Sequence, residues 1–143
     1  MDIRRSHPDD ATAIAEMELN IFGDPWGQKD IFSYICSDTG MCFTALDGGE
    51  VIGYIIGRKI PPEGEIYRIA VRPDRRQRGI GYRLLSYALK TERGSGVETV
   101  FLEVRESNIP ARALYKAYGF NEISIRKNYY QNPTENAVIM MLG

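Results

Sequence analysis

Residues 72–85, RPDRRQRGIGYRLL, place four arginines and two glycines directly before an apolar run with helical spacing. The N-terminus of a helix has unpaired backbone N–H groups and a partial positive charge, so it binds anions. Gly79 and Gly81 remove the side chains that would keep a phosphate from those amides, and the arginines can add charge-assisted contacts. We therefore expect this loop to bind a polyphosphate. The plainer alternative is a solvated basic turn, because short glycine motifs are weak evidence by themselves.

Other polyphosphate-binding motifs fit this segment less well. A P-loop requires Gly-Lys followed by Ser or Thr, whereas Tyr82 and Arg83 stand at the corresponding place. A dinucleotide-binding fold uses an acid about twenty residues farther on, where Glu103 lies, but Leu84 occupies its third glycine position. A nucleic-acid module would interleave aromatic residues with the basic run, and only Tyr82 is near it. These alternatives are disfavoured.

Two further residues have side chains suited to proton transfer. Glu103 lies in the apolar run VFLEV, where strand alternation places it on the opposite face from Leu102 and Val104. A carboxylate there is either a solvated surface residue or a base in a cleft, and the pattern favours neither. Tyr115 lies on a helical stripe with Ala111, which is typical of a buried tyrosine that only packs. The residues alone assign no catalytic role to either side chain.

The elements that would position these residues follow from periodicity and turn signals. Alternation predicts strands, a spacing of about 3.6 residues predicts helices, and Gly, Pro and Asn clusters predict the turns between them. The order is an antiparallel meander followed by β-α-β-α-β-β, which indicates a single α/β or α+β domain covering residues 1–143. The predicted strands are 2–5, 41–46, 51–58, 65–71, 99–104, 121–126 and 137–142, and the predicted helices are about 9–21, 28–35, 80–92 and 107–120.

The composition limits the class of protein. Lys and Arg number 18 and Asp and Glu 19, so the net charge of −1 argues against a general nucleic-acid or membrane-surface binder. The longest apolar stretch is too short to span a bilayer, and the first residues lack the apolar segment of a signal peptide. Cys36 and Cys42 form no Cys-x-x-Cys pair and His7 is the sole histidine, so no metal site is expected. Free thiols fit a reducing cytosol, and we expect a cytoplasmic protein.

Longer stretches of the chain resemble one enzyme family. The stretch IAVRPDRRQRGIGYRLL resembles the acetyl-CoA-binding motif of the Gcn5-related N-acetyltransferases (GNAT). That motif is Arg or Gln, two residues, Gly, one residue, then Gly or Ala, and Arg76, Gly79 and Gly81 fit it. LEVRESNIPARALYKAYGF and RKNYYQNPTENAVIM, together with Pro25 and Trp26, resemble the RimI-type subfamily, which acetylates the N-terminal alanine of a small-subunit ribosomal protein. The resemblance covers nearly the whole chain in the expected order.

This resemblance implies the α/β (α+β) GNAT acyl-CoA N-acyltransferase fold, with a central mixed, mostly antiparallel sheet of about six to seven strands flanked by about four helices. It also implies acetyl-CoA as the cosubstrate. The strand from Ile69 to Val71 would offer backbone groups to the pantetheine arm, and the amides from Gln77 to Tyr82 would hold the pyrophosphate. Asn108, otherwise a plain helix N-cap, would contact the cofactor from the next helix. The implied cofactor-binding residues are Ile69, Ala70, Val71, Arg76, Gln77, Arg78, Gly79, Ile80, Gly81, Tyr82 and Asn108.

The resemblance also implies catalytic and acceptor-binding residues. Acetyl transfer requires an amine that loses a proton and a thiolate that gains one. By similarity, Glu103 would be the base, acting through water, and Tyr115 would be the acid that protonates the coenzyme A sulfur. The acceptor groove would be lined by Pro25, Trp26, Tyr129 and Tyr130, although aromatic residues at such places often only pack.

The leading hypothesis is therefore an N-terminal protein acetyltransferase that acts on the α-amine of the N-terminal alanine of a ribosomal protein. It would use no metal, contact neither nucleic acid nor membrane directly, and exist as a monomer or weak dimer. One alternative is a GNAT enzyme that acetylates a small-molecule amine or a lysine. Another is a non-catalytic acyl-CoA sensor, and the presence of both Glu103 and Tyr115 argues against it.

Overall fold

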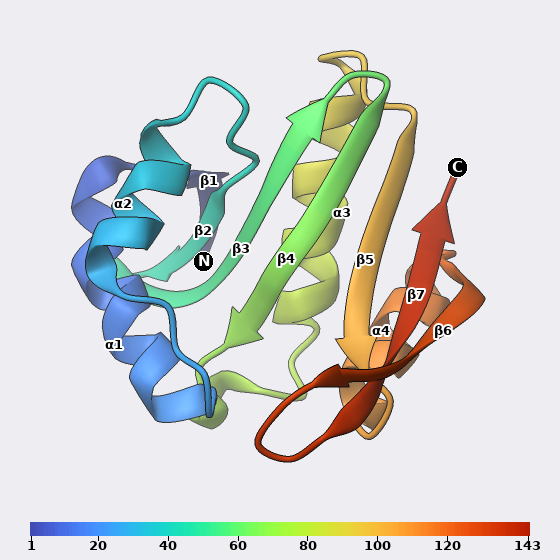
Figure 1. The fold of residues 1–143 in the computed structure, drawn as a ribbon. Helices are drawn as coiled ribbons and strands as arrows, with labels where there is room; N and C mark the ends of the chain where they lie inside the picture. Colours follow the sequence, from blue (N-terminus) through green and yellow to red (C-terminus); the bar gives the residue numbers. More distant parts are fainter.

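A computed structural model describes residues 1–143. Seven strands form one sheet at the centre of the fold (Figure 1). The strands are β1 (Asp2–Arg5), β2 (Phe43–Asp47), β3 (Glu50–Ile60), β4 (Glu63–Val71), β5 (Thr99–Arg105), β6 (Asn121–Tyr130) and β7 (Glu135–Leu142). Their order across the sheet is β1-β2-β3-β4-β5-β7-β6, and every neighbouring pair except β4 and β5 is antiparallel. This mixed, mostly antiparallel sheet confirms the expected fold class.

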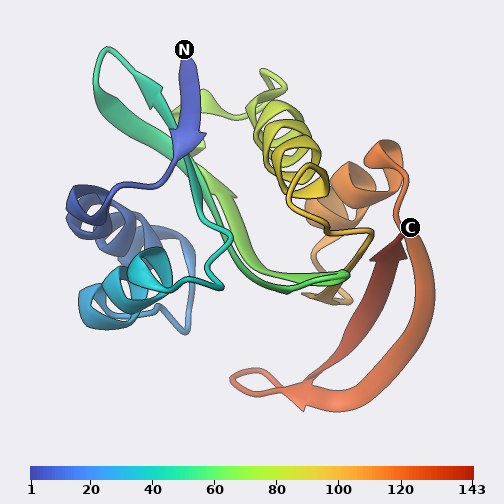
Figure 2. The same ribbon diagram turned by 90° about the horizontal axis from the view of Figure 1, so that it is seen from above.

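Four α-helices flank the sheet, two on each face (Figure 2). They are α1 (Ala11–Ile21), α2 (Gln28–Cys36), α3 (Ile80–Arg93) and α4 (Ile109–Tyr118), and the short 3-10 helices η1 (Pro8–Asp10) and η2 (Pro73–Arg75) lie before α1 and α3. All the predicted strands and helices are present. The largest boundary error concerns β6, which continues beyond residue 126 to Tyr130 through an irregular register with β7, so simple alternation did not reveal its full length. None of the helices is both long and apolar enough to cross a membrane.

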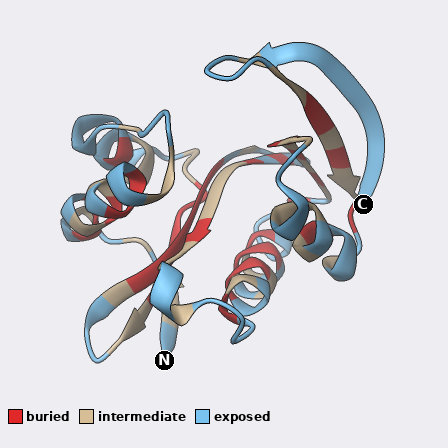
Figure 3. Ribbon diagram, turned by 90° about the horizontal axis from the view of Figure 1, so that it is seen from below, coloured by how far each residue is buried: buried red, intermediate tan, exposed pale blue.

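Each face of the sheet has its own core, because alternate residues along β3 point in opposite directions. Ile55 packs in a cluster of 19 buried residues that includes the apolar stripe of α3. Tyr54 and Ile56 pack in a smaller cluster of 8 buried residues against α1 and α2. In Figure 3 the buried residues follow these inward faces, whereas β6 is exposed along almost its whole length. The sheet therefore separates an α1–α2 side from an α3–α4 side.

The two parallel strands pair along only part of their length. Pairing between β4 and β5 runs from Glu63 opposite Thr99 to Ile66 opposite Leu102, yet both strands continue beyond these residues. At this point β4 contains a bulge: in its register with β3, Tyr67 has no partner. A bulge bends and twists its strand, and in Figure 1 β4 and β5 diverge toward their arrowheads. We call the region beyond Ile66 and Leu102 the split.

Candidate active site

The loop before α3 has the backbone conformation that the glycine motif requires. Gly79, the N-cap of α3, has φ +73°, and Gln77 also has a positive φ of 63°. Such left-handed residues are rare outside glycine, and they aim successive amides toward one side of a loop. No side chain caps α3, so the N–H groups of its first turn are not satisfied by a cap. We call residues 76–82 the glycine loop, and its geometry supports anion binding by backbone amides.

The structure gives the two glycines of the motif different roles, rather than the shared one we expected. A Cβ placed on Gly79 would meet nothing within 4 Å, so this glycine is needed for its left-handed backbone. A Cβ on Gly81 would lie 3.3 Å from Leu114 Cδ2 of α4 and 3.8 Å from Val71 Cγ2 of β4. Gly81 therefore allows α3 to pack closely against α4 and β4, and its missing side chain does not point into an open phosphate site.

Acidic neighbours neutralise part of the positive charge that precedes α3. The Arg72 guanidinium binds Asp74 at 2.6 Å and Glu50 at 2.8 Å. Arg75 forms an ion pair with Asp47, and this hydrogen bond lowers the pKa of the Asp47 carboxyl. These two arginines hold the loop against the β2–β3 turn.

The remaining arginines of the loop differ in their contacts. Arg76 Nε donates a hydrogen bond of 3.0 Å to the carbonyl oxygen of Val71, so it ties the glycine loop to the end of β4. Arg78 is exposed and has no ion-pair or hydrogen-bond partner, which leaves its guanidinium available to an anion. Asn108 caps α4 as predicted, because its Oδ1 accepts the Ala111 N–H at 3.3 Å. Its exposed side-chain amide nitrogen remains available as a donor.

The last part of β4 has one free edge. Residues Ile69, Ala70 and Val71 pair with β3, but beyond Ile66 no strand pairs with the other edge of β4. Unpaired N–H and C=O groups of such an edge can bind an extended ligand as a further strand would. The split therefore places a free backbone edge beside the glycine loop.

Glu103 lies on the face of β5 that the alternation predicted. Val100, Leu102 and Val104 are buried in the α3–α4 core, whereas the Glu103 side chain points to the opposite face and is 22% exposed. The Nη1 atom of Arg126 on β6 donates a hydrogen bond of 2.9 Å to its carboxylate. Glu103 thus lies at the split as a partly solvated carboxylate on the α1–α2 side of the sheet.

Tyr115 lies on α4 and is only 5% exposed. Its ring packs against Phe120 with a centroid distance of 5.6 Å. Burial, followed by the proximity of Tyr130, raises the pKa of the Tyr115 hydroxyl well above its usual range. Burial and the charge of Glu103 raise the pKa of Tyr130 to about 12. Both tyrosines therefore stay protonated at neutral pH.

The proposed walls of the acceptor groove come from two separate segments. Pro25 and Trp26 lie in the α1–α2 connection, and Tyr129 and Tyr130 end β6. The rings of Tyr129 and Tyr130 are 5.1 Å apart and nearly perpendicular. The structure brings the tyrosine pair close to Glu103, whose contact raises the pKa of Tyr129.

A buried carboxylate fixes the Trp26 wall. Glu18 of α1 is fully buried and accepts the Trp26 backbone N–H at 3.0 Å, the Tyr54 hydroxyl, and an ionic contact from Arg68 Nε at 3.4 Å. The Arg68 guanidinium lies over the Trp26 ring, 5.0 Å from its centroid. Glu18 is not among the residues predicted from the sequence, although a signal was present: it occupies a position on the apolar stripe of α1 with Ile14.

The bulge explains why Tyr67 and Arg68 were also missed. Strict alternation along EIYRIAV predicts that consecutive residues point to opposite faces. Because Tyr67 is the extra residue of the bulge, its ring contacts Trp26 on the same side of the sheet as Arg68, with a centroid distance of 6.0 Å. The charge of Arg68 also acts on Tyr130, whose pKa it lowers slightly against the larger effect of burial. No single-residue pattern in the sequence signals this arrangement.

Comparison with known proteins identifies the class of enzyme. The pattern that defines the Acetyltransferase (GNAT) family matches residues 11–120. The chain therefore belongs to this family and is an acyltransferase, which confirms the expectation from the glycine motif. GNAT acetyltransferases use acetyl-CoA. The glycine loop and the free edge of β4 fit such a ligand.

The chain is also similar to individual proteins whose names specify an N-acetyltransferase activity. The ribosomal protein bS18-alanine N-acetyltransferase of Escherichia coli (strain K12) is 35% identical over 135 residues, which cover 93% of this chain and 90% of that protein. The N-alpha-acetyltransferase RimI of Mycobacterium tuberculosis is 36% identical over 137 residues, covering 92% of this chain and 85% of that protein. The crystal structure of the ribosomal-protein-S18-alanine N-acetyltransferase from Escherichia coli superposes with a TM-score of 0.91 at 34% identity, covering 99% of this chain and 92% of that one. The expected RimI-type resemblance is confirmed.

Proposed function

We propose that this enzyme transfers the acetyl group of acetyl-CoA to the α-amine of an N-terminal alanine, with the N-terminal segment of ribosomal protein bS18 as the acceptor. The observation that carries the proposal is the similarity, over most of the chain, to relatives named for this reaction. The site supports it, because an anion-binding loop and a free strand edge lie on one side of the split and a carboxylate with aromatic walls lies on the other.

The cofactor would be held mainly by backbone groups. The free edge of residues 69–71 would pair with the pantetheine arm, and the amides of the glycine loop would bind the pyrophosphate. Arg78 and the side-chain amide of Asn108 would add two contacts from side chains that have unused donors. When bound, acetyl-CoA supplies an acetyl group that its thioester linkage activates toward an amine.

Glu103 would take the proton that the attacking amine loses. A peptide α-amine has a pKa near 8, so about a quarter of it is neutral at pH 7.5, and a modest base is sufficient. The Glu103 carboxylate faces the acceptor side and keeps part of its surface open to solvent, which suits proton transfer through water. Arg126 would hold the carboxylate in place through its 2.9 Å hydrogen bond.

Tyr115 would return a proton to the leaving sulfur. Its raised pKa keeps the hydroxyl protonated throughout the neutral range, so it acts as an acid and not as a base. Its burial also limits access of bulk water to the proton that it donates. Glu103 and Tyr115 would thus have separate roles, one on each side of the sheet.

The acceptor groove favours the end of a chain over a lysine. A lysine amine with a pKa near 10.4 is neutral only about one time in a thousand at pH 7.5, so one carboxylate acting through water suits the α-amine better. A groove walled by Trp26 on one side and by Tyr129 and Tyr130 on the other would admit an extended peptide end more readily than a side chain in the middle of a chain.

Two peptides test this proposal. The first begins with alanine and has the N-terminal sequence of the bS18 protein from the same organism. The second is the same peptide with a blocked N-terminus and one added lysine. We expect acetylation of the first at least tenfold faster at equal concentration, measured by mass spectrometry with acetyl-CoA. Faster modification of the blocked peptide would assign the enzyme to lysine instead.

A further inference from the structure

Glu135, the first residue of β7, binds two segments of the chain that lead to different parts of the site. Its side chain is only 16% exposed. Its Oε1 atom accepts a hydrogen bond of 3.3 Å from Arg105 Nη1, and its Oε2 atom accepts the Ser107 backbone N–H at 2.6 Å. Hydrogen bonds from Ser107 and Arg105 lower the pKa of the Glu135 carboxyl, so it is ionised throughout the neutral range. We call Arg105, Ser107 and Glu135 the junction.

The first contact of Glu135 leads to the tyrosine pair of the proposed acceptor groove. The Arg105 guanidinium lies over the Tyr130 ring, 4.4 Å from its centroid. It also donates to two carbonyl oxygens in the turn that follows β6, with Nη2 3.1 Å from that of Gln131 and Nη1 3.3 Å from that of Pro133. A planar guanidinium can serve several acceptors while its face packs on a ring. Arg105 therefore holds the turn and Tyr130 together, and Glu135 holds Arg105.

The second contact of Glu135 leads to the start of α4. Ser107 precedes Asn108, the N-cap whose side-chain amide is proposed to contact the cofactor. The Asn108 backbone N–H donates to the carbonyl oxygen of Arg105 at 2.9 Å, so the connection from β5 to α4 is a tight turn. The preceding N–H, that of Ser107, is held by Glu135. Glu135 therefore helps to set where α4 begins and where Asn108 lies.

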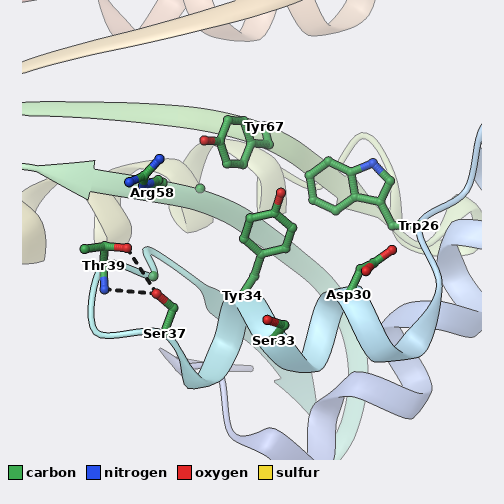
Figure 4. Close-up of a pocket in the computed structure, with 10 residues that line it drawn as sticks. Trp26, Asp30, Ser33, Tyr34, Ser37, Thr39, Arg58 and Tyr67 are labelled. Atoms are coloured by element: carbon green, nitrogen blue, oxygen red, sulfur yellow. Dashed lines mark hydrogen bonds between the residues drawn. The ribbon is translucent and has the colours of Figure 1, made fainter.

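The junction is distinct from the contacts that hold the Trp26 wall. Figure 4 shows the Trp26 ring facing Tyr34 of α2, at a cavity of about 660 Å³ between α2 and the strands β3 and β4. No junction residue lines that cavity. The contacts that fix Trp26 come from Glu18 and Arg68, on other elements. The tyrosine pair thus has a support of its own, and it shares that support with the start of α4.

Both partners of Glu135 are hydrogen-bond donors, and this pattern requires a carboxylate. A carboxylate accepts hydrogen bonds at both of its oxygens, whereas a side-chain amide has one acceptor oxygen and one N–H₂ donor. In Glu135→Gln, the amide nitrogen would face either the Arg105 guanidinium or the Ser107 N–H, and a donor placed against a donor forms no hydrogen bond. Glutamine has nearly the same size, yet it cannot keep both contacts.

We propose that Glu135 is a positioning residue for both substrates, because one carboxylate holds the tyrosine pair through Arg105 and the start of α4 through Ser107. This inference rests on the proposed function, since it assumes that the acceptor peptide contacts Tyr130 and that coenzyme A contacts Asn108. Displaced binding groups weaken binding without removing a reacting group. Loss of the junction should therefore change KM and Kd more than kcat.

The experiment compares three variants. Glu135→Gln breaks one contact of the junction whichever way the amide lies, and it removes the charge that strengthens the other. Arg105→Lys keeps the positive charge but loses the planar fork and its packing on the aromatic ring, while the Ser107 contact remains. Glu122→Gln is the matched control, because Glu122 lies on β6 of the same hairpin and pairs with an arginine of α4 at 2.8 Å, but contacts no junction residue.

Three quantities are measured for each variant: the KM for an alanine-starting peptide at saturating acetyl-CoA, kcat, and the calorimetric Kd for coenzyme A. In Glu135→Gln, the peptide KM and the Kd should each rise about threefold to tenfold, as is typical when a charge-assisted hydrogen bond is lost, while kcat changes less than about threefold. Arg105→Lys should raise the peptide KM by a similar factor and leave the Kd unchanged. Glu122→Gln should alter none of these values.

A purely structural role of Glu135 predicts a different result. Glu135→Gln would then lower the melting temperature but leave the peptide KM and the Kd for coenzyme A at the wild-type values. KM and Kd do not depend on the amount of folded enzyme, so partial loss of folding does not affect them. Unchanged values, or a change in only one of the two, would overturn the inference and leave the proposed function intact. Failure of the wild-type enzyme to acetylate any alanine-starting peptide would instead contradict the proposed function.

Discussion

The glycine loop and the proposed acceptor groove are built from different parts of the chain. The glycine loop offers mainly backbone amides, and its shape depends on the positive φ values of Gln77 and Gly79. The proposed acceptor groove would consist of side chains, with Trp26 on one wall and Tyr129 and Tyr130 on the other. A phosphate needs only N–H groups and positive charge, whereas a peptide acceptor must be distinguished by shape and side-chain chemistry.

The two regions also differ in what holds them in place. Ion pairs of Arg72 and Arg75 and the hydrogen bond of Arg76 fix the glycine loop from its exposed side. The Trp26 wall instead depends on Glu18, a carboxylate buried in the smaller core. We infer that changes in the loop should act on cofactor affinity, and that changes around Trp26 should act on the acceptor.

The largest effects are expected where the two regions meet, at Glu103 and Tyr115. Glu103→Gln removes the proposed base, and Tyr115→Phe removes the proposed acid, so each should lower kcat by about 10²- to 10⁴-fold at pH 7. The two variants should differ in pH dependence. The residual rate of Glu103→Gln should rise up to about pH 8, as the amine deprotonates unaided, whereas the rate of Tyr115→Phe should stay low. Rate profiles from pH 6 to 9 at saturating substrates would measure this.

The raised pKa of Tyr115 sets one more expectation for that profile. Burial raises the pKa of the Tyr115 hydroxyl above its ordinary value of 10.0. Deprotonation of Tyr115 should therefore not lower the wild-type rate within the measured pH range. Calorimetric binding of coenzyme A should be nearly unchanged in both variants, since neither removes a proposed contact to the pyrophosphate or the pantetheine arm. A loss of less than about tenfold in kcat for either variant would argue against its assigned role.

The next effect separates the two glycines of the loop. Gly79→Val forces a branched residue into a left-handed conformation that costs about 1–2 kcal/mol. The free loop can relax away from that conformation, so cofactor binding must restore it, and the Kd for coenzyme A should rise about tenfold. Gly79→Asn should be milder, because asparagine tolerates this region. Calorimetry with coenzyme A measures both values.

Gly81→Val provides the contrast within the same motif. Its side chain would crowd Leu114, so the main effect should be overpacking that lowers stability by about 1–3 kcal/mol, measured by thermal denaturation. A folded Gly81→Val variant that loses more affinity than Gly79→Val would show that Gly81, and not Gly79, controls access to the amides.

The sequence predicted the sheet, the helices and the glycine loop because these depend on local patterns. The apolar stripe of α3, with Leu84 and Leu85 buried, follows directly from helical spacing. The acceptor side was less predictable, because it depends on contacts between distant segments. Glu18 and Tyr54 are far apart in sequence, and the bulge at Tyr67 changes which face its neighbours occupy. Only the folded chain reveals that such residues share one site.

The smallest of these effects tests how the Trp26 wall is held. Glu18→Gln keeps the size of the side chain but removes the charge that faces the mostly buried Arg68, and it weakens one of the hydrogen bonds from Trp26 and Tyr54. Leaving such buried groups poorly satisfied should cost about 1–3 kcal/mol of stability.

The Trp26 wall should then become less ordered, so the KM for an alanine-starting peptide should rise about threefold to fivefold while the Kd for coenzyme A is unchanged. The exposed Glu16→Gln on the same helix is the matched control and should alter neither value. Because the glycine loop lies beside the other core, an effect of Glu18→Gln on coenzyme A binding equal to its effect on peptide KM would contradict the separation of the two regions. Peptide KM at saturating acetyl-CoA, calorimetry and thermal denaturation together distinguish these outcomes.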